Sequence, residues 1–382
     1  MTIILLLSLS GYSKNLERYF FWEQLILDNL QDINALWLFS FCISLGLAVL
    51  IVLFHKLFLN FDHSLSDVQV AHLVPTPRYG GVAVFSAIAA SAFFFHLEDV
   101  KWIIVSSLPI FLIGLAEDCY FKTAPTLRFI LGVISAVFGI LLSGVVLNSV
   151  DFEYFDRLLS MPLVAFIFTV FCIVGLINAV NLIDGLHGLS SGVSVVMSVS
   201  FLFVSQNVGD VELAKLGMIL AGASLGLMVL NFPFGKIFLG DSGAYFIGFS
   251  IAWLMILLAI RHEEVSKWSL LAIASWPIME TIFSIFRRKL RGRSSNKPDR
   301  MHFHHIAMRG LEIISRRRIS RQGSNPLATI LLLPLASLPA LLGIAYSRSQ
   351  EAGIIICISS LCAYILTYNG ILFLLKKKKF RL

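Results

Sequence analysis

Long apolar runs separated by short polar segments dominate the pattern of this chain. A helix needs about 20 apolar residues to cross a bilayer core about 30 Å thick. Eleven runs approach that length, at 34–54, 80–97, 100–116, 129–147, 161–180, 189–205, 212–230, 243–260, 268–286, 327–346 and 353–375. The pattern predicts an all-α integral membrane protein, a single polytopic domain over residues 1–382 with about 11 transmembrane helices.

Composition supports this prediction and argues against a soluble domain. Of the 382 residues, 57% are hydrophobic and only 14% are charged, whereas soluble domains carry about 25% charged residues. The five cysteines form no CxxC pair and predict no disulfide framework. The apolar run at residues 1–7 is too short to cross a membrane and precedes no clear cleavage site, so we expect no cleaved signal peptide.

The positive charge gathers where it would orient a membrane protein. Of the 30 Lys and Arg residues, twelve lie between Arg287 and Arg321, and five close the chain. When the helices alternate back from a cytoplasmic C-terminus, one side holds 22 of these residues and the other side 8. By the positive-inside rule the first side is the cytoplasm, and the N-terminus lies outside. The net charge of +7 therefore reflects topology, and we expect no nucleic acid partner.

Every loop rich in Gly, Asp, Asn and His falls on this predicted cytoplasmic side. These loops lie near 55–79, 117–128, 181–188 and 231–242, with a long basic loop at 287–325. The opposite loops, such as 98–101 and 206–211, carry no such clusters. We therefore expect catalytic loops that face the cytoplasm, where nucleotide-activated substrates occur.

Two adjacent carboxylates, Glu117 and Asp118, end the third apolar run. Such a pair at a membrane edge is unfavourable unless it is hydrated, paired or bound to a metal ion. Mg²⁺ takes carboxylate oxygens together with substrate phosphates. The alternative is a solvated start of a loop.

A second polar group, Asn178, Asn181 and Asp184, extends along one face of a helix end at a spacing of three residues. These side chains are costly in lipid without partners. Gly185 and Gly188, on either side of His187, allow a tight turn near a ligand. The alternative is a helix end held by hydrogen bonds between helices.

Two further segments combine glycine with charge. In segment 231–243, Asn231 and Asp241 would suit a nucleotide diphosphate with its cation, although an ordinary helix N-cap is the alternative for Asp241. In segment 75–81, Arg78 precedes two glycines whose backbone N–H groups would suit a phosphate. The alternative is an ordinary turn.

The basic loop contains His302, His304 and His305, preceded by Arg300. Three histidines in four positions suit Zn²⁺ or phosphate. The many neighbouring arginines favour anion binding over a metal cage, and an exposed polar loop is the alternative.

With these segments in view, the chain resembles the polyprenyl-phosphate N-acetylhexosamine-1-phosphate transferases, glycosyltransferase family 4. Segment 178–189 is similar to the family motif NxxNxxDGxDGL, 231–243 to its N-to-GDxG segment, and 298–305 to its PDRxHxHH form. The likeness covers about residues 75–305. The Pro-Thr-Pro-Arg motif at 75–78 and the Arg-rich loop look more like the branch that initiates O-antigen and common antigen than like the peptidoglycan branch.

The resemblance implies transfer of a sugar-1-phosphate from UDP-GlcNAc or UDP-GalNAc to undecaprenyl phosphate, with release of UMP. It implies Mg²⁺, or alternatively Mn²⁺, held chiefly by Asp241 and by Asp118. Direct attack and a covalent aspartyl intermediate both stay open, as does a homodimer. Motifs and resemblance together predict catalytic roles for Glu117, Asp118, Asp184, Asp241, His304 and His305, and substrate contacts for Arg78, Asn178, Asn181, His187, Asn231, Arg300 and His302.

Two residues depart from the family pattern. Glu117 stands where the family has the first Asp of its pair, and His187 replaces the second Asp of DGxDG. These departures leave a non-catalytic paralogue as one alternative. A UDP-MurNAc-pentapeptide transferase and a polytopic transporter are two others, although transporters place ionisable groups near the bilayer midplane.

Overall fold

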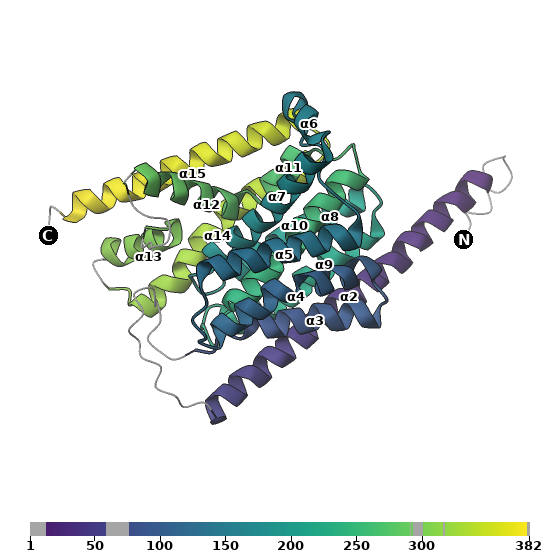
Figure 1. The fold of residues 1–382 in the computed structure, drawn as a ribbon. Coiled ribbons are helices and arrows are strands. Elements are labelled where there is room, and N and C mark those ends of the chain that lie inside the picture. The colour runs from purple at the N-terminus through teal and green to yellow at the C-terminus, as the bar shows by residue number, and fades with distance from the viewer. Residues whose placement is uncertain (1–12, 59–75, 291, 293–300, 316–317, 380–382) are drawn as a thin grey trace, which may run out of the picture.

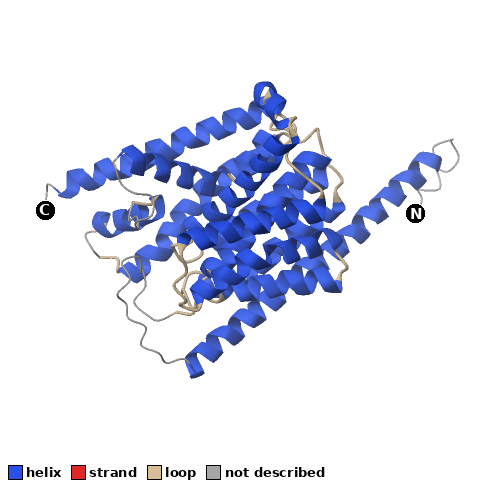
Figure 2. Cartoon of the chain, in the orientation of Figure 1, coloured by secondary structure: helices blue, strands red, loops and turns tan. Residues whose placement is uncertain are grey.

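The computed structural model describes residues 13–58, 76–290, 292, 301–315 and 318–379, and over these residues it contains helices and no strand (Figure 2). The predicted all-α class is therefore confirmed. The helices are α2 (Ser13–Phe58), α3 (Gly80–Phe94), α4 (Glu98–Asp118), α5 (Pro125–Ser143), α6 (Glu153–Leu159), α7 (Pro162–Leu182), α8 (Leu189–Asn207), α9 (Val211–Asn231), α10 (Gly240–Arg261), α11 (Lys267–Ile273), α12 (Ser275–Leu290), α13 (Phe303–Ile314), α14 (Arg321–Ala345) and α15 (Gln350–Lys379).

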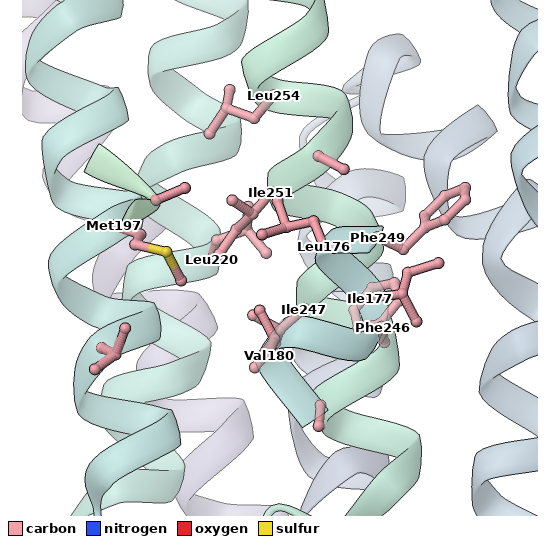
Figure 3. Packing of buried hydrophobic residues seen from close by; sticks show 14 of the residues in the cluster. Leu176, Ile177, Val180, Met197, Leu220, Phe246, Ile247, Phe249, Ile251 and Leu254 are labelled. Atoms are coloured by element: carbon pink, nitrogen blue, oxygen red, sulfur yellow. The ribbon is translucent and has the colours of Figure 1, made fainter. Parts of the chain in front are cut away.

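Helix α10 is the centre of the bundle, since 18 of its 22 residues are buried. It packs against α3, α4 and α7, while α9 lies between α2 and α8, and α14 covers α8 and α11 (Figure 1). Figure 3 shows how α10 meets its neighbours: Phe246 and Ile247 lie beside Ile177 and Val180 of α7. Ile251 lies beside Leu176 of α7 and Leu220 of α9. The start of α2 and the end of α15 lie on opposite sides of the molecule (Figure 1).

Each of the eleven predicted runs overlaps a helix, and the run 268–286 spans both α11 and α12. The number of crossings differs from eleven. Among the described residues nine helices are long and apolar enough to cross a membrane, and a tenth crossing results if α11 and α12 form one span. These two helices meet at an angle of 80°. Pro277, in the first turn of α12, lacks the N–H that would bond to the carbonyl of Ile273, so the helix is interrupted there.

The short helix α3 accounts for the remaining predicted crossing. It has 15 residues, fewer than the roughly 20 that a crossing needs. It begins at Gly80 because the preceding segment runs along the loop before α10, where Gly80 N donates to Phe238 O at 2.9 Å. It ends before His96, which has a φ of 54°.

Small residues bring the ends of three helices together near this loop. A Cβ on Gly114 of α4 would lie 2.7 Å from the backbone of Ser242 in α10, and a Cβ on Gly81 of α3 would collide with Gly243 of α10. Small residues allow helix backbones to approach closely in membrane proteins. The ends of α3, α4 and α10 therefore meet closely enough for their polar groups to share one site.

Four helical segments lie outside the predicted crossings. Helix α2 extends 46 residues from Ser13, so its N-terminal part precedes the predicted run at 34–54. The seven-residue helix α6 lies between α5 and α7. Helix α13 lies within the long basic loop and packs on α14, and α14 begins at Arg321, six residues before the predicted run.

Two buried glycines of α5 give a matched test of this close packing. A Cβ on Gly139 would lie 2.5 Å from the Trp253 ring, whereas a Cβ on Gly132 would meet its nearest neighbour at 3.8 Å. We expect Gly139→Ala to destabilise the protein by about 1–3 kcal/mol through overpacking. We expect Gly132→Ala to be neutral or slightly stabilising. Thermal unfolding in detergent measures the difference, and equal shifts would contradict this packing.

Candidate active site

The carboxylate of Asp118 caps the N-terminus of the central helix. Asp118 ends α4 and is fully buried. Its Oδ1 accepts a hydrogen bond from Asp241 N at 2.8 Å, and its Oδ2 accepts from Ser242 N at 2.9 Å and Ser242 Oγ at 2.6 Å. A carboxylate is favourable there because the first N–H groups of a helix lack partners within it and carry partial positive charge.

A second carboxylate completes this arrangement. Asp184, in the turn between α7 and α8, accepts a hydrogen bond from Gly240 N. Three successive N–H groups of α10 therefore bind two aspartates. Gly240 has a φ of +75°, and a Cβ there would lie 2.6 Å from both carboxylate oxygens of Asp118. The geometry thus requires glycine.

The side chain of Asp241 faces three polar partners from other helices and segments. Its Oδ1 accepts from Asn181 Nδ2 at 3.1 Å and lies 3.5 Å from Arg78 Nη2. Its Oδ2 lies 3.2 Å from Arg128 Nη1. The predicted N-cap alternative for Asp241 is wrong, because Asp118 and Asp184 supply the capping oxygens.

The cluster carries a surplus of buried negative charge. Burial, together with the charges of Asp241 and Asp118, raises the pKa of Asp184 to about 7, against the lowering effect of Arg78. No three His, Cys, Asp or Glu side chains in the described parts of the chain form a complete metal cage. One or two carboxylates plus substrate phosphates are, however, the usual Mg²⁺ site. The residues fit such an ion, and Mg²⁺ or Mn²⁺ at Asp241 and Asp118 stays a prediction.

Glu117 turns away from Asp118. Its Oε2 accepts from the backbone N of Thr123 at 2.9 Å and from the hydroxyl of Thr123 at 2.5 Å. Its Oε1 lies 3.9 Å from Arg128, which also pairs with Asp241. The longer arm of Glu117 therefore links the 119–124 turn to Arg128, which belongs to the site.

The predicted role of the glycines after Arg78 is wrong. Their N–H groups do not face an anion, because Gly80 N donates to Phe238 O and Gly81 N donates to Leu239 O at 2.7 Å. Arg78 itself does reach the site, with its guanidinium near both Asp118 and Asp241. Pro75 of this motif lies outside the described residues.

Asn231 joins two loops of the site. Its Oδ1 accepts from Gly188 N at 2.6 Å and from Ser191 Oγ at 3.4 Å, and its Nδ2 donates to Ile237 O at 2.6 Å. The side chain is buried. The structure thus gives Asn231 a positioning role, which differs from the predicted contact with the nucleotide.

His187, which departs from the family pattern, has a comparable role. Its Nδ1 donates to Pro233 O at 2.9 Å, because a carbonyl can only accept. Its backbone N donates to Asn325 Oδ1 at 2.7 Å, and its carbonyl accepts from Thr329 Oγ1 at 2.8 Å. Burial lowers the pKa of His187, so the substitution removes a negative charge without adding a positive one. Sequence analysis missed Asn325 and Thr329, although polar residues at an apolar helix are a signal.

The histidine segment reaches the site through Gly185. A Cβ on Gly185 would lie 2.5 Å from His304 Nε2, and Gly185 directly follows Asp184. His304 is buried, and its Nδ1 has no partner among the described residues. The ring of His305 lies 4.3 Å from that of His304, centroid to centroid.

The environment of His304 disfavours its charged form. Burial, together with His305 and His302, lowers the pKa of His304 well below its usual value. At neutral pH its ring is therefore neutral and does not balance phosphate charge.

One predicted substrate contact, Asn178, is not joined to this cluster. Asn178 is exposed on α7, and its Nδ2 donates to Val174 O of the same helix at 2.8 Å. Arg300 lies outside the described residues. The structure adds a buried acid instead, Glu280, whose carboxylate contacts His302 at 2.9 Å. Its signal in the sequence is a single acid within the apolar run 268–286.

The chain is similar to known proteins over much of its length. Residues 100–259 match the model of glycosyl transferase family 4. The chain is 31% identical over 238 residues to a probable undecaprenyl-phosphate N-acetylglucosaminyl 1-phosphate transferase of Bacillus subtilis, covering 61% of this chain and 65% of the relative. It is 29% identical to a decaprenyl-phosphate N-acetylglucosaminephosphotransferase of Mycobacterium tuberculosis, covering 61% and 66%. It is 25% identical to an undecaprenyl-phosphate alpha-N-acetylglucosaminyl 1-phosphate transferase of Escherichia coli O157:H7, covering 68% and 75%.

The matched segments cover 65% and 66% of the length of the first two relatives.

The Asp118 cap gives a direct test of this geometry. Asp118→Asn places an amide donor against the N–H groups of α10, and we expect it to cost about 2 kcal/mol of stability because charged hydrogen bonds are lost. Glu98→Gln changes an exposed pair with Lys101 and should change stability by less than about 1 kcal/mol. Thermal unfolding in detergent compares them, and an unshifted Asp118→Asn protein would contradict the cap.

The neutral ring of His304 predicts a dependence of stability on pH. Because the pKa of His304 is lowered in the folded state, the unfolded chain binds a proton first as the pH falls through about 6.5. The folded protein should therefore lose up to about 1.4 kcal/mol per pH unit below that value from this group. Thermal unfolding at pH 7.5 and 5.5 should show a smaller loss in His304→Gln than in the wild type, and equal losses would refute the assignment.

Proposed function

The core of this chain belongs to glycosyl transferase family 4, and on that premise we propose that the protein transfers N-acetylhexosamine-1-phosphate from a UDP-sugar to undecaprenyl phosphate. The donor is of the UDP-GlcNAc or UDP-GalNAc type, and UMP is released. The observation that carries this proposal is the convergence of Asp118, Asp184, Asp241 and Arg78 at one end of the bundle. The names of the relatives support the choice of substrates.

In the proposed reaction an oxygen of the lipid phosphate attacks the phosphorus attached to the sugar. The bond to the bridging oxygen breaks, and UMP leaves with that oxygen and its negative charge. A phosphate monoester is largely ionised at pH 7, since its second pKa lies near 6. The nucleophile therefore needs no base, and phosphoryl transfer depends mainly on positioning and charge neutralisation.

The side chains of the site divide this work. Arg78 and Arg128 pair with Asp241, and we propose that both guanidinium groups turn to diphosphate oxygens when the donor binds. Mg²⁺, held by Asp241 with Asp118 beside it, would supply charge neutralisation between the two phosphates. Asp118 is fixed by three hydrogen bonds from α10, so we propose direct attack by the lipid, with Asp118 as a positioning group and not as a covalent nucleophile.

We also propose where the active site faces and which pathway uses the product. Helix α13, of the basic loop, and the C-terminal end of α15 lie on one side of the molecule (Figure 1), which supports a site that faces the cytoplasm of the inner membrane. The product would start a cell-envelope polysaccharide such as O-antigen. A peptidoglycan precursor transferase finds less support, since the relatives named above act on N-acetylglucosamine. A transporter would gather its polar groups near the midplane, whereas these lie at helix ends.

An exchange assay tests the proposal. Labelled UMP is supplied with undecaprenyl phosphate, Mg²⁺ and unlabelled UDP-GlcNAc or UDP-GalNAc, and label should enter the UDP-sugar. We expect Asp241→Asn to reduce the exchange at least about 100-fold because phosphate charge is no longer neutralised, and removal of Mg²⁺ to abolish it. Glu98→Gln, at the opposite end of α4, should exchange normally.

The donor that exchanges identifies the sugar. Exchange only with UDP-MurNAc-pentapeptide would favour the peptidoglycan enzyme. Folded wild-type protein that exchanges no donor would overturn the proposed activity.

A further inference from the structure

A buried carboxylate lies behind the histidine segment. Glu280 lies on α12, six residues after the break at Ala274, and its side chain is 1% exposed. Its Oε1 lies 2.9 Å from His302 Nδ1 and 3.1 Å from Phe303 N, and its Oε2 accepts from the Tyr364 hydroxyl at 2.7 Å. Three elements, α12, α13 and α15, thus meet at one carboxylate.

This carboxylate caps α13 from another helix. His302 is the N-cap residue, but its own side chain makes no capping hydrogen bond. Phe303 N, the first N–H of the helix, donates to both oxygens of Glu280. A negative charge at this place also opposes the positive end of the helix dipole. The start of α13, and with it the direction of the histidines, therefore depends on α12.

Neighbouring groups hold the same turn. Tyr368 of α15 donates to Met301 O at 2.9 Å, and Arg287 of α12 donates to the same carbonyl and to the Tyr368 hydroxyl. The rings of Phe303 and Tyr364 pack with centroids 4.9 Å apart. Polar and aromatic contacts together fix residues 301–303 between two helices.

Glu280 also determines which ring nitrogen of His302 carries the proton. Phe303 N and Tyr364 Oη both donate to the carboxylate, so it is the acceptor, and His302 Nδ1 must be the donor. The His302 ring lies parallel to that of His304, with centroids 5.6 Å apart and an angle of 2° between the planes. A chain of contacts therefore runs from Glu280 through His302 and His304 to Gly185, beside Asp184.

We propose that Glu280 is a positioning residue for the transfer reaction, which holds His302 in its Nδ1–H form and aligns the histidines with the aspartate cluster. This inference rests on the proposed function. Glu280 touches no substrate in this scheme and acts through His302. A carboxylate behind a histidine commonly fixes the tautomer and orientation of the ring, and its loss from comparable sites lowers activity about 10- to 100-fold.

The activity test is a double-mutant cycle with the exchange assay. Glu280→Gln keeps the shape of the side chain, and we expect kcat to fall about 10- to 100-fold. His302→Gln should lower kcat by a similar factor. The kcat of the double variant should be no lower than that of the poorer single variant, because both changes interrupt one chain of contacts. The proposal would be overturned if the double variant lost activity by the product of the two single factors, or if Glu280→Gln kept full activity.

A neighbouring residue supplies the control. Thr281 follows Glu280 on α12, and its hydroxyl bonds to Pro277 O in the same helix. Thr281→Val should retain wild-type exchange within about twofold, since its hydrogen bond is internal to the helix.

A second readout does not depend on activity. ¹⁵N NMR of ring-labelled histidine in the wild-type protein shows which nitrogen of each ring is protonated, and the signal missing from His302→Gln identifies His302 among the nine histidines. We expect the Nδ1–H form, or a ring protonated on both nitrogens. An Nε2–H form would overturn the proposal even if Glu280→Gln failed to fold. An inactive wild type with the Nδ1–H form would refute the proposed function and still support the Glu280–His302 bond.

Discussion

The capped N-terminus of α10 is the interaction on which the rest of the site depends. Helix α10 is buried on nearly all sides, so its first N–H groups cannot rely on water and need protein acceptors. Asp118 and Asp184 supply them from the ends of α4 and α7. The same contacts that stabilise the central helix therefore bring three aspartates to one place.

This arrangement makes the cluster costly without counter-charge and well suited to a charged substrate. Two arginines, Arg78 and Arg128, reach Asp241 from outside the helix. Burial keeps the pKa of Asp184 raised, although Arg78 lowers it. A cation that joins the carboxylates and a diphosphate that joins the arginines would balance both signs at once, which is the charge pattern of a nucleotide-sugar with a divalent ion.

The histidine segment, residues 302–305, is held in place by contacts from neighbouring helices. The histidines lie on a short helix that has little support of its own, and α12 and α15 hold its first turn through Glu280, Tyr364 and Tyr368. The contact between His304 and Gly185 then joins this half to the aspartates. A helix held from outside places three rings side by side, which a free loop would not do without a large loss of conformational entropy.

The sequence by itself determined the all-helical membrane class, because apolar runs of about 20 residues allow few other structures in lipid. It also identified Asp118, Asp184, Asp241 and the histidines, since charged groups next to such runs need a reason to be there. Periodicity could not reveal that α11 and α12 meet at 80° or that α3 has only 15 residues, because both depend on contacts between distant segments.

Only the tertiary structure decided what each polar residue touches. Asn231 binds two loops and not an open site, the amides of Gly80 and Gly81 are already bonded, and Glu280 reaches His302 across 22 positions of sequence. A sequence shows that a polar group must find a partner in the membrane. The folded chain alone determines which partner it finds, because hydrogen bonds depend on distances of about 3 Å between residues that are far apart in the chain.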